Sequence, residues 1–183
     1  MKRGHALALS AAVAVAAALA GAAYQLLPRD SGVARGPGPE AVVGRIYGAR
    51  LTDVKGVVQP MEQWRGRVLV VNFWATWCAP CREEIPGFVK LQARHGSRGL
   101  TFVGIAIDQP DKVAEFAREF GINYPLLVGG LESMELLREA GNRAGLLPYT
   151  LVIDRQGRLV SREPGGLKET RLESLLLPLL TAP

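Results

Sequence analysis

Residues 72–86 decide the fold, because their sequence, NFWATWCAPCREEIP, joins an apolar segment to two closely spaced cysteines. The apolar segment starts at residue 68 with Val-Leu-Val-Val, a composition typical of a strand that is covered on both faces. Cys78 and Cys81 follow it and open a segment of broadly helical apolar spacing over about 79–95. A strand that leads into cysteines at a helix start predicts chemistry at the end of a sheet.

Cys78 and Cys81 are the only two cysteines of the chain, so neither has another intramolecular disulfide partner. Their spacing lets the two sulfurs close a small ring. The unpaired N–H groups and the dipole at a helix start favour a negative sulfur at Cys78 and lower its pKa. Cys81, one turn further along, is expected to be more buried and to act as the resolving thiol.

Other uses of such a cysteine pair fit less well. Structural zinc needs four ligands, and the chain adds only His5 and His95. Covalent haem attachment needs a histidine directly after the second cysteine, where Arg82 stands. A purely structural disulfide is the third alternative, although small rings of this kind are strained and easily reduced. The pair therefore predicts redox catalysis with no metal and no cofactor.

Strands and helices alternate along the rest of the chain. Strands are expected at residues 45–52, 57–59, 68–74, 101–107, 124–128, 150–154 and 158–161. Helices are expected at residues 79–95, at 111–120 with Asp111 as its cap, at 131–140, and at 168–180 with an interruption at Pro178. This order predicts an α/β protein with a mostly parallel sheet covered on both faces, with a hairpin at each end of the domain.

The N-terminus predicts a targeting segment. Lys2 and Arg3 precede an uncharged run at residues 6–27, which as a helix would span roughly 33 Å, enough to cross a bilayer core. The charges before the run place the rest of the chain on the far side of the membrane. Residues 1–28 are thus a signal-anchor or, because residues 20–23 resemble a processing site, a cleaved signal peptide. Residues 29–40 read as a Gly/Pro linker, and residues 41–183 as one domain.

The net charge of +5 does not indicate a nucleic-acid partner. Three of these five charges lie in residues 1–36, and the remainder of the chain is nearly balanced. A nucleic-acid binder usually carries a stripe of clustered Lys and Arg.

The block at 72–86 resembles the active site of thioredoxin-fold proteins, and it is most similar to the membrane-anchored thiol-disulfide oxidoreductases of the TlpA/ResA/CcmG type. The resemblance covers about residues 41–178 and includes segments 103–108 and 145–154. An extra helix and strand at 111–128 resemble the insert of this branch. The resemblance implies a thioredoxin-like three-layer α/β/α sandwich with an N-terminal β-hairpin and a helix-strand insert.

The resemblance also implies roles for single residues. Pro148 resembles the cis-proline that faces the cysteine pair, and it would leave the backbone of Leu147 free to pair with an extended substrate segment. Trp77 would shield the exposed sulfur and contact partners. Glu84 matches an acidic residue that influences cysteine ionisation and proton transfer, with Glu83 beside it as an ordinary surface charge.

Asn72 is a departure from cytoplasmic thioredoxin, which has a buried Asp at this position. The Lys partner of that Asp is also absent, because the next strand has Gly104 and Ile105 there. Asn cannot accept a proton at neutral pH, so Glu84 becomes the acid/base candidate.

The implied reaction is the reduction of disulfides in exported proteins at the periplasmic face of the bacterial inner membrane, or in the periplasm if the signal peptide is cleaved. Cys78 attacks the client, Cys81 resolves the mixed disulfide, and a membrane donor of the DsbD or CcdA type reduces the pair again. Apocytochrome c and copper-site proteins are the usual clients of the family. Both the client and the direction of electron flow are open at this point.

Two other classes compete with this interpretation. A thiol peroxidase of the AhpC/TSA kind has Thr three positions before its reactive Cys, whereas Ala75 stands there and Thr76 is two before. A copper-binding metallochaperone would use Cys78 and Cys81 as soft ligands.

Overall fold

The structure is a computed structural model that describes residues 37–181. The predicted targeting segment, with the uncharged run at 6–27, and the first part of the predicted linker lie outside the described residues. Within the described part of the chain, no helix combines the length and the apolar character that a membrane span needs.

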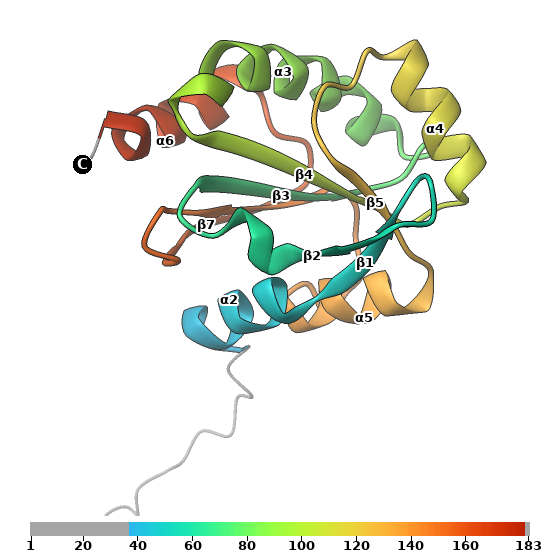
Figure 1. Cartoon of the computed structure of the whole chain (residues 1–183), viewed down its shortest axis with the longest axis horizontal. Coiled ribbons are helices and arrows are strands. Elements are labelled where there is room, and N and C mark those ends of the chain that lie inside the picture. The colour runs from blue at the N-terminus through green and yellow to red at the C-terminus, as the bar shows by residue number, and fades with distance from the viewer. Residues whose placement is uncertain (1–36, 182–183) are drawn as a thin grey trace, which may run out of the picture. The chain divides into compact units, whose positions relative to one another are not determined.

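A seven-stranded sheet forms the middle layer, in the order β2-β1-β5-β4-β3-β6-β7 (Figure 1). Its strands are β1 (Arg50–Asp53), β2 (Val58–Pro60), β3 (Val68–Trp74), β4 (Leu100–Ala106), β5 (Leu126–Val128), β6 (Tyr149–Ile153) and β7 (Leu159–Pro164). The helices are α2 (Pro39–Gly48), α3 (Ala79–His95), α4 (Pro110–Glu119), α5 (Leu131–Glu139) and α6 (Glu169–Thr181), with short 3-10 turns at Met61–Trp64 and Gly96–Arg98.

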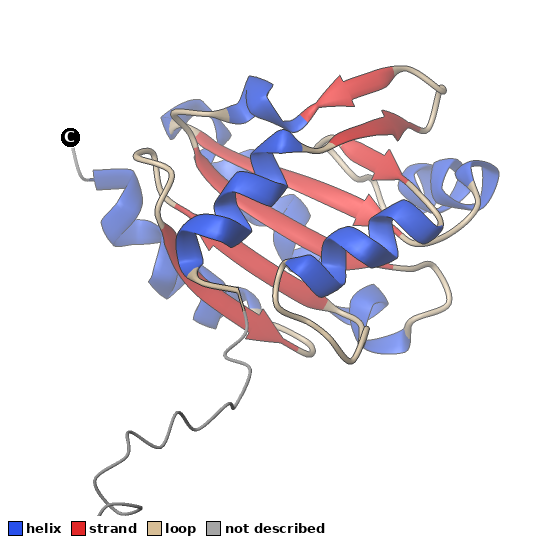
Figure 2. Ribbon diagram, turned by 90° about the horizontal axis from the view of Figure 1, so that it is seen from below, coloured by secondary structure: helices blue, strands red, loops and turns tan. Residues whose placement is uncertain are grey.

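The central strand β3 is buried along its whole length because helices cover both of its faces. Alternate side chains of β3 enter two separate cores. Val68, Val70 and Trp74 pack with α3, α4 and α6, whereas Leu69, Val71 and Phe73 pack with α2 and α5. Figure 2 shows α2 and α5 lying across their face of the sheet. Asn72 is in phase with the first set, so it faces the layer that contains α3.

The expected three-layer α/β/α sandwich is confirmed, with the N-terminal hairpin β1–β2 and the insert α4–β5. The prediction of a mostly parallel sheet is wrong. Only β3–β4 and β4–β5 are parallel among the described strands, and the other four pairs are antiparallel. The parallel core is flanked by antiparallel strands on both sides, because β1 pairs with β5 on one side and β6 pairs with β3 on the other.

Four local predictions also need correction. Residues 45–48 belong to helix α2 and not to a strand, because Pro39 starts a helix whose Val42, Val43, Ile46 and Tyr47 are buried on one side. The linker therefore ends before residue 40. The cap of α4 is Gln109, without a side-chain bond, and Asp111 lies in its first turn. Helix α6 runs through Pro178 to Thr181.

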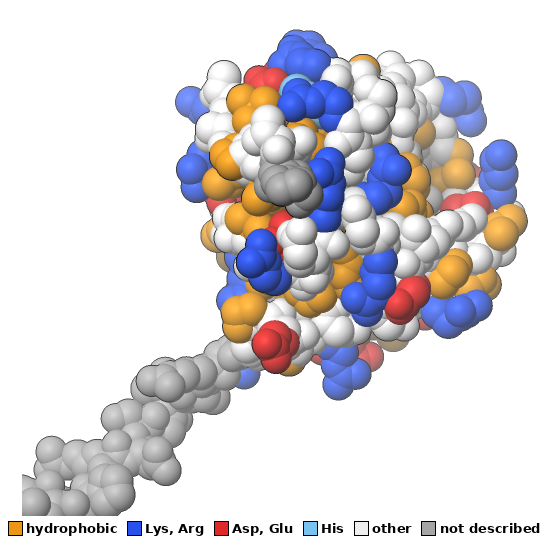
Figure 3. Space-filling model, turned by 60° about the vertical axis from the view of Figure 1, so that its left-hand side comes forward, with side chains coloured by type: hydrophobic (Ala, Val, Ile, Leu, Met, Phe, Trp, Pro, Cys, Tyr) orange, Lys and Arg blue, Asp and Glu red, His pale blue; other side chains and the backbone are white. Residues whose placement is uncertain are grey.

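Both positive and negative side chains lie on the face of the domain that Figure 3 shows. On the face drawn in Figure 3, Lys and Arg side chains are scattered among uncharged and apolar ones.

Candidate redox site

Cys78 and Cys81 lie where β3 passes into α3. Cys78 is the N-cap of α3, and its Sγ accepts a hydrogen bond from Cys81 N at 3.4 Å. The two sulfurs are joined as a disulfide. Cys78 keeps 6% of its surface exposed, whereas Cys81 is fully buried. The predicted placement of both residues is therefore confirmed, and their order of attack stays a prediction.

Trp77 directly precedes Cys78 in the chain, and its side chain is 69% exposed. A large aromatic side chain held in water next to a reactive sulfur offers an apolar surface to a partner. Its predicted contact with substrate stays a prediction.

The Leu147–Pro148 peptide bond is cis, as the resemblance implied. Pro148 directly precedes β6, whose Tyr149 pairs with Phe73 near the end of β3. This pairing brings Pro148 to the end of the sheet at which β3 passes into the Cys78 segment. Leu147 is half-buried, and the carbonyl of Pro148 accepts a hydrogen bond from Gly165 N at 2.9 Å, so the loop after β7 lies at the same edge.

Glu84 lies one turn after Cys81 on α3, and it is only 5% exposed. Its Oε1 accepts from Asn72 Nδ2 at 2.8 Å, and its Oε2 accepts from Leu167 N at 2.9 Å. Burial raises its pKa from 4.5 to about 7, although these two hydrogen bonds oppose the rise. A carboxyl group in this state can give or take a proton near neutral pH. Its neighbour Glu83 is exposed.

Asn72 acts as a double donor in this buried cluster. Its Nδ2 also donates to Thr150 Oγ1 at 3.0 Å, while its Oδ1 has no hydrogen-bond partner among the described residues. The departure from thioredoxin thus places an amide directly against Glu84. The missing Lys partner agrees with the packing at Gly104. A Cβ there would lie 2.7 Å from a methyl group of Leu126 and 3.0 Å from the Trp74 indole nitrogen, so a side chain at this position would be crowded.

A pocket of about 430 Å³ lies beside Glu84, between the start of α3 and the loop that precedes α6. Its wall includes Pro80 from the cysteine motif and the segment Gly166-Leu167. Glu84 is one of the residues that line this pocket, so solvent comes close to its mostly buried side chain.

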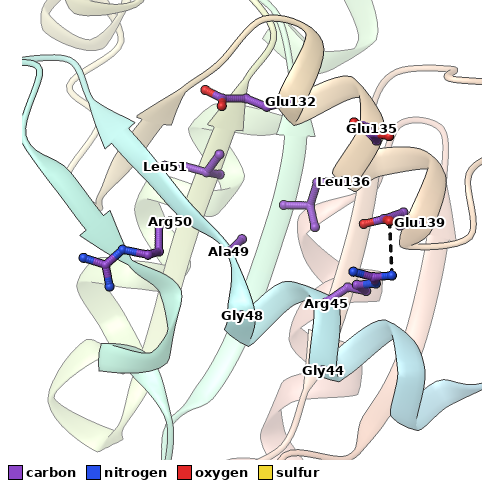
Figure 4. Close-up of a pocket in the computed structure, with 10 residues that line it drawn as sticks. All are labelled: Gly44, Arg45, Gly48, Ala49, Arg50, Leu51, Glu132, Glu135, Leu136 and Glu139. Atoms are coloured by element: carbon purple, nitrogen blue, oxygen red, sulfur yellow. Dashed lines mark ion pairs between the residues drawn. The ribbon is translucent and has the colours of Figure 1, made fainter.

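A second pocket, drawn in Figure 4, lies between α2 and α5 and has a volume of about 350 Å³. It is open over Gly44 and Gly48, where a Cβ, if added, would have no described atom within 4 Å beyond those of its chain neighbours and of the helix backbone. The ion pair between Arg45 and Glu139, at 3.6 Å, crosses one side of it. Because α2 and α5 cover the face opposite α3, this pocket is no part of the redox site.

His95 lies at the last residue of α3, at the opposite end of the helix from the cysteines. It is buried and its Nε2 lies 2.9 Å from Glu173 Oε1 of α6. Its position serves the packing of α6 on α3 and not the cysteine pair.

Sequence reasoning missed Leu167 and Thr150, the two contacts that complete the Glu84 cluster. Leu167 contributes only its backbone N–H, which carries no residue signal. Thr150 reaches Asn72 through the β3–β6 register, which joins residues 78 positions apart.

We expect the Leu167 amide to report the ionisation of Glu84. A charged carboxylate accepts a shorter and stronger hydrogen bond than a neutral carboxyl group. The amide proton of Leu167 should therefore move downfield as the pH rises, with a midpoint near the Glu84 pKa of about 7. A two-dimensional ¹H–¹⁵N titration of the oxidised protein measures this. Glu84→Gln should abolish the movement and Glu83→Gln should keep it, whereas a flat Leu167 signal in the unsubstituted protein would contradict the assignment.

Comparison with known proteins agrees with this geometry. The profile of the Redoxin family matches residues 38–176. The thiol-disulfide oxidoreductase ResA of Geobacillus kaustophilus is 30% identical over 67% of this chain and 69% of its own length. The thiol:disulfide interchange protein HelX of Rhodobacter capsulatus is 32% identical over 78% of this chain and 79% of its own length.

A solved structure gives the same result. The thiol:disulfide interchange protein of the thioredoxin family from Chlorobium tepidum has a TM-score of 0.65 and 31% identity, over 72% of this chain and 92% of that protein. The chain therefore belongs to the Redoxin family, as a TlpA/ResA/CcmG-like thiol-disulfide oxidoreductase that acts on disulfide-containing substrates.

Proposed function

We propose that the protein reduces disulfides of exported proteins at the periplasmic face of the bacterial inner membrane, with apocytochrome c or copper-site proteins as clients. The uncharged run at 6–27, preceded by Lys2 and Arg3, supports this location.

The direction of electron flow is argued from one observation, the buried carboxyl group of Glu84 near the cysteine pair. A strong oxidant stabilises its reduced, thiolate form. A carboxylate close to the pair does the opposite, because it disfavours a second negative charge. Glu84 lies one turn from Cys81, in the same buried layer, and ionises near neutral pH. This arrangement supports a reductase.

The electrons balance in two exchange steps. The thiolate of Cys78 attacks one sulfur of the client disulfide, and the other client sulfur leaves as a thiolate. Cys81, after loss of its proton, attacks Cys78 and releases the second client sulfur. The client gains two electrons, its two thiolates take up the proton released by Cys81 and one proton from solvent, and the Cys78–Cys81 disulfide forms. Glu84 can take the proton of Cys81 and pass it on through the neighbouring pocket.

The oxidised protein then needs a two-electron donor. A membrane dithiol protein of the DsbD or CcdA type, fed from the cytoplasm, would supply the electrons in an oxidising compartment. The anchor would keep the cysteine pair close to this donor.

The midpoint potential of the Cys78–Cys81 pair tests the direction. We expect a value close to that of thioredoxin, about −270 mV, and a value near about −120 mV would show an oxidant instead.

Single-turnover rates of the reduced protein with an oxidised Cys-x-x-Cys-His peptide and with an oxidised copper-site peptide compare the two client classes. Labelling of reduced Cys78 by a membrane-impermeant reagent in spheroplasts tests the location.

A further inference from the structure

The loop that contains Trp77 is hydrogen-bonded to a residue that lies outside helix α3. The carboxylate of Asp108 accepts two hydrogen bonds from Thr76 through one oxygen, one from the backbone N–H at 3.1 Å and one from the hydroxyl. Its other oxygen accepts from Gln109 N at 2.8 Å. One side chain therefore joins the segment after β4 to the segment after β3.

The register of the two parallel strands explains this contact. Trp74 lies opposite Ala106, and the bond from Ile107 N to Trp74 O, at 2.9 Å, follows as the strands end. Thr76 and Asp108 each lie two residues beyond their strand. The Asp108 carboxylate supplies an acceptor for the Thr76 N–H, which the sheet no longer provides.

The same loop has a second attachment. Arg82 Nη1 donates to Thr76 O at 3.3 Å. Its guanidinium group lies 5.1 Å from the ring centre of Phe116 and 5.2 Å from that of Phe120, and the two rings stack at 4.0 Å. These aromatic residues lie on α4 and at its C-cap, and α4 begins two residues after Asp108. The helix-strand insert is thus tied to the active-site loop at two points.

The charge of Asp108 strengthens its bonds. Partial burial opposes ionisation, but the hydrogen bonds from Thr76 and Gln109, together with nearby Lys112, hold the pKa of Asp108 below its usual value. It is therefore a charged acceptor at neutral pH, and such hydrogen bonds are stronger than neutral ones.

We propose that Asp108 is a positioning residue of the redox reaction, which holds the backbone at Thr76 and Trp77 so that Trp77 and Cys78 meet the client disulfide in a fixed geometry. The inference rests on the disulfide-reducing function proposed above. Attack on a disulfide needs the sulfur atoms in line, and a small displacement of one reactant lowers the rate strongly. A loop that moves freely would lose this alignment, although the thiol itself stays reactive.

Asp108→Ala tests the proposal in two measurements. The ¹⁵N order parameters of the Trp77 and Cys78 amides should fall from about 0.85 to below about 0.6. The single-turnover rate with an oxidised Cys-x-x-Cys-His peptide should fall about tenfold. Alkylation of Cys78 by iodoacetamide, on the plateau of its pH profile, should change less than twofold, because a small reagent needs no alignment.

Three further variants complete the test. Asp111→Ala removes an exposed carboxylate from the first turn of α4 and should leave both measurements unchanged. Asp108→Asn keeps an acceptor for the Thr76 N–H and should restore most of the rate. Thr76→Val removes only the hydroxyl bond and should give a smaller loss, which also tests the contact if Asp108→Ala does not fold.

Unchanged order parameters in Asp108→Ala, or a mobile loop with a normal peptide rate, would overturn the proposal. A peptide rate that falls equally in Asp111→Ala would do so as well. If the unsubstituted protein does not reduce the peptide, the proposed function fails, while the order parameters still decide whether Asp108 holds the loop.

Discussion

Replacing Cys81 with serine should stop turnover and leave the protein covalently attached to its client. Cys78 keeps its place at the start of α3 and its partial exposure, so attack on the client disulfide continues. Resolution needs a second thiol one turn away, which serine cannot supply. We expect the multiple-turnover rate to fall roughly thousandfold or more, because the two cysteines act as one unit.

The trapped species is the decisive measurement. Non-reducing electrophoresis and mass spectrometry should show a mixed disulfide between Cys78 and the client, which dithiothreitol releases. Cys78→Ser is the matched control: it should be equally inactive but trap little, because Cys81 is fully buried. Trapping through Cys81 in that variant would reverse the assigned roles of the two residues.

The central part of the fold could be predicted because its signals are local. The apolar run at β3 and the spacing in α3 depend only on neighbouring residues, and both elements lie where expected. The alternation of strands and helices also predicted the layers correctly.

The edges of the sheet could not be predicted in the same way. Contacts between residues far apart in the chain decide which strand pairs with β5. Its partner β1 lies more than 70 positions before it. The last residues of helix α2, Arg45 to Gly48, fit a strand by themselves, because the proline that starts the helix lies further back, in the predicted linker. The buried side chains of α2 pack into the core shared with α5, and this contact is also distant in sequence.

The residues of the site show the same difference between local sequence signals and contacts that are distant in the chain. Cys78 and Cys81 follow from spacing alone, and the resemblance supplied Glu84 and Pro148. The partners that set the properties of Glu84 could not be read from the sequence, because Leu167 lies 83 positions away and donates through its backbone. The Asp108 contact depends on two loops that only the parallel register of β3 and β4 brings together.

Replacing Glu84 with glutamine should stabilise the oxidised protein at alkaline pH. In the folded protein Glu84 keeps its proton up to about pH 7, whereas the unfolded chain releases it near the ordinary value of 4.5. The folded state thus binds more protons in this window, and stability is lost as the pH rises from 4.5 to 7. Above pH 7 the buried charge costs about 3 kcal/mol, and the neutral amide avoids this cost.

Denaturant titrations at several pH values measure the effect. The unfolding free energy of Glu84→Gln should exceed that of the unsubstituted protein by about 3 kcal/mol at pH 8.5, and the two should converge near pH 4.5. Use of the oxidised form removes thiol titration, since disulfide cysteines carry no ionisable proton. Burial, with the charge of Glu84 as a second cause, raises the pKa of Tyr124, so this nearby group stays neutral throughout.

Glu83→Gln is the matched control, because it removes the same charge from an exposed position of the same helix turn. Surface substitutions of this kind usually change stability by less than about 0.5 kcal/mol. A gain in Glu84→Gln that is independent of pH would show better packing and not the relief of a buried charge. A gain in unfolding free energy that grows with pH, together with slower reduction of the client by Glu84→Gln, would have a different meaning. The protein would then keep a destabilising carboxylate near its cysteines because the exchange of protons and electrons requires it.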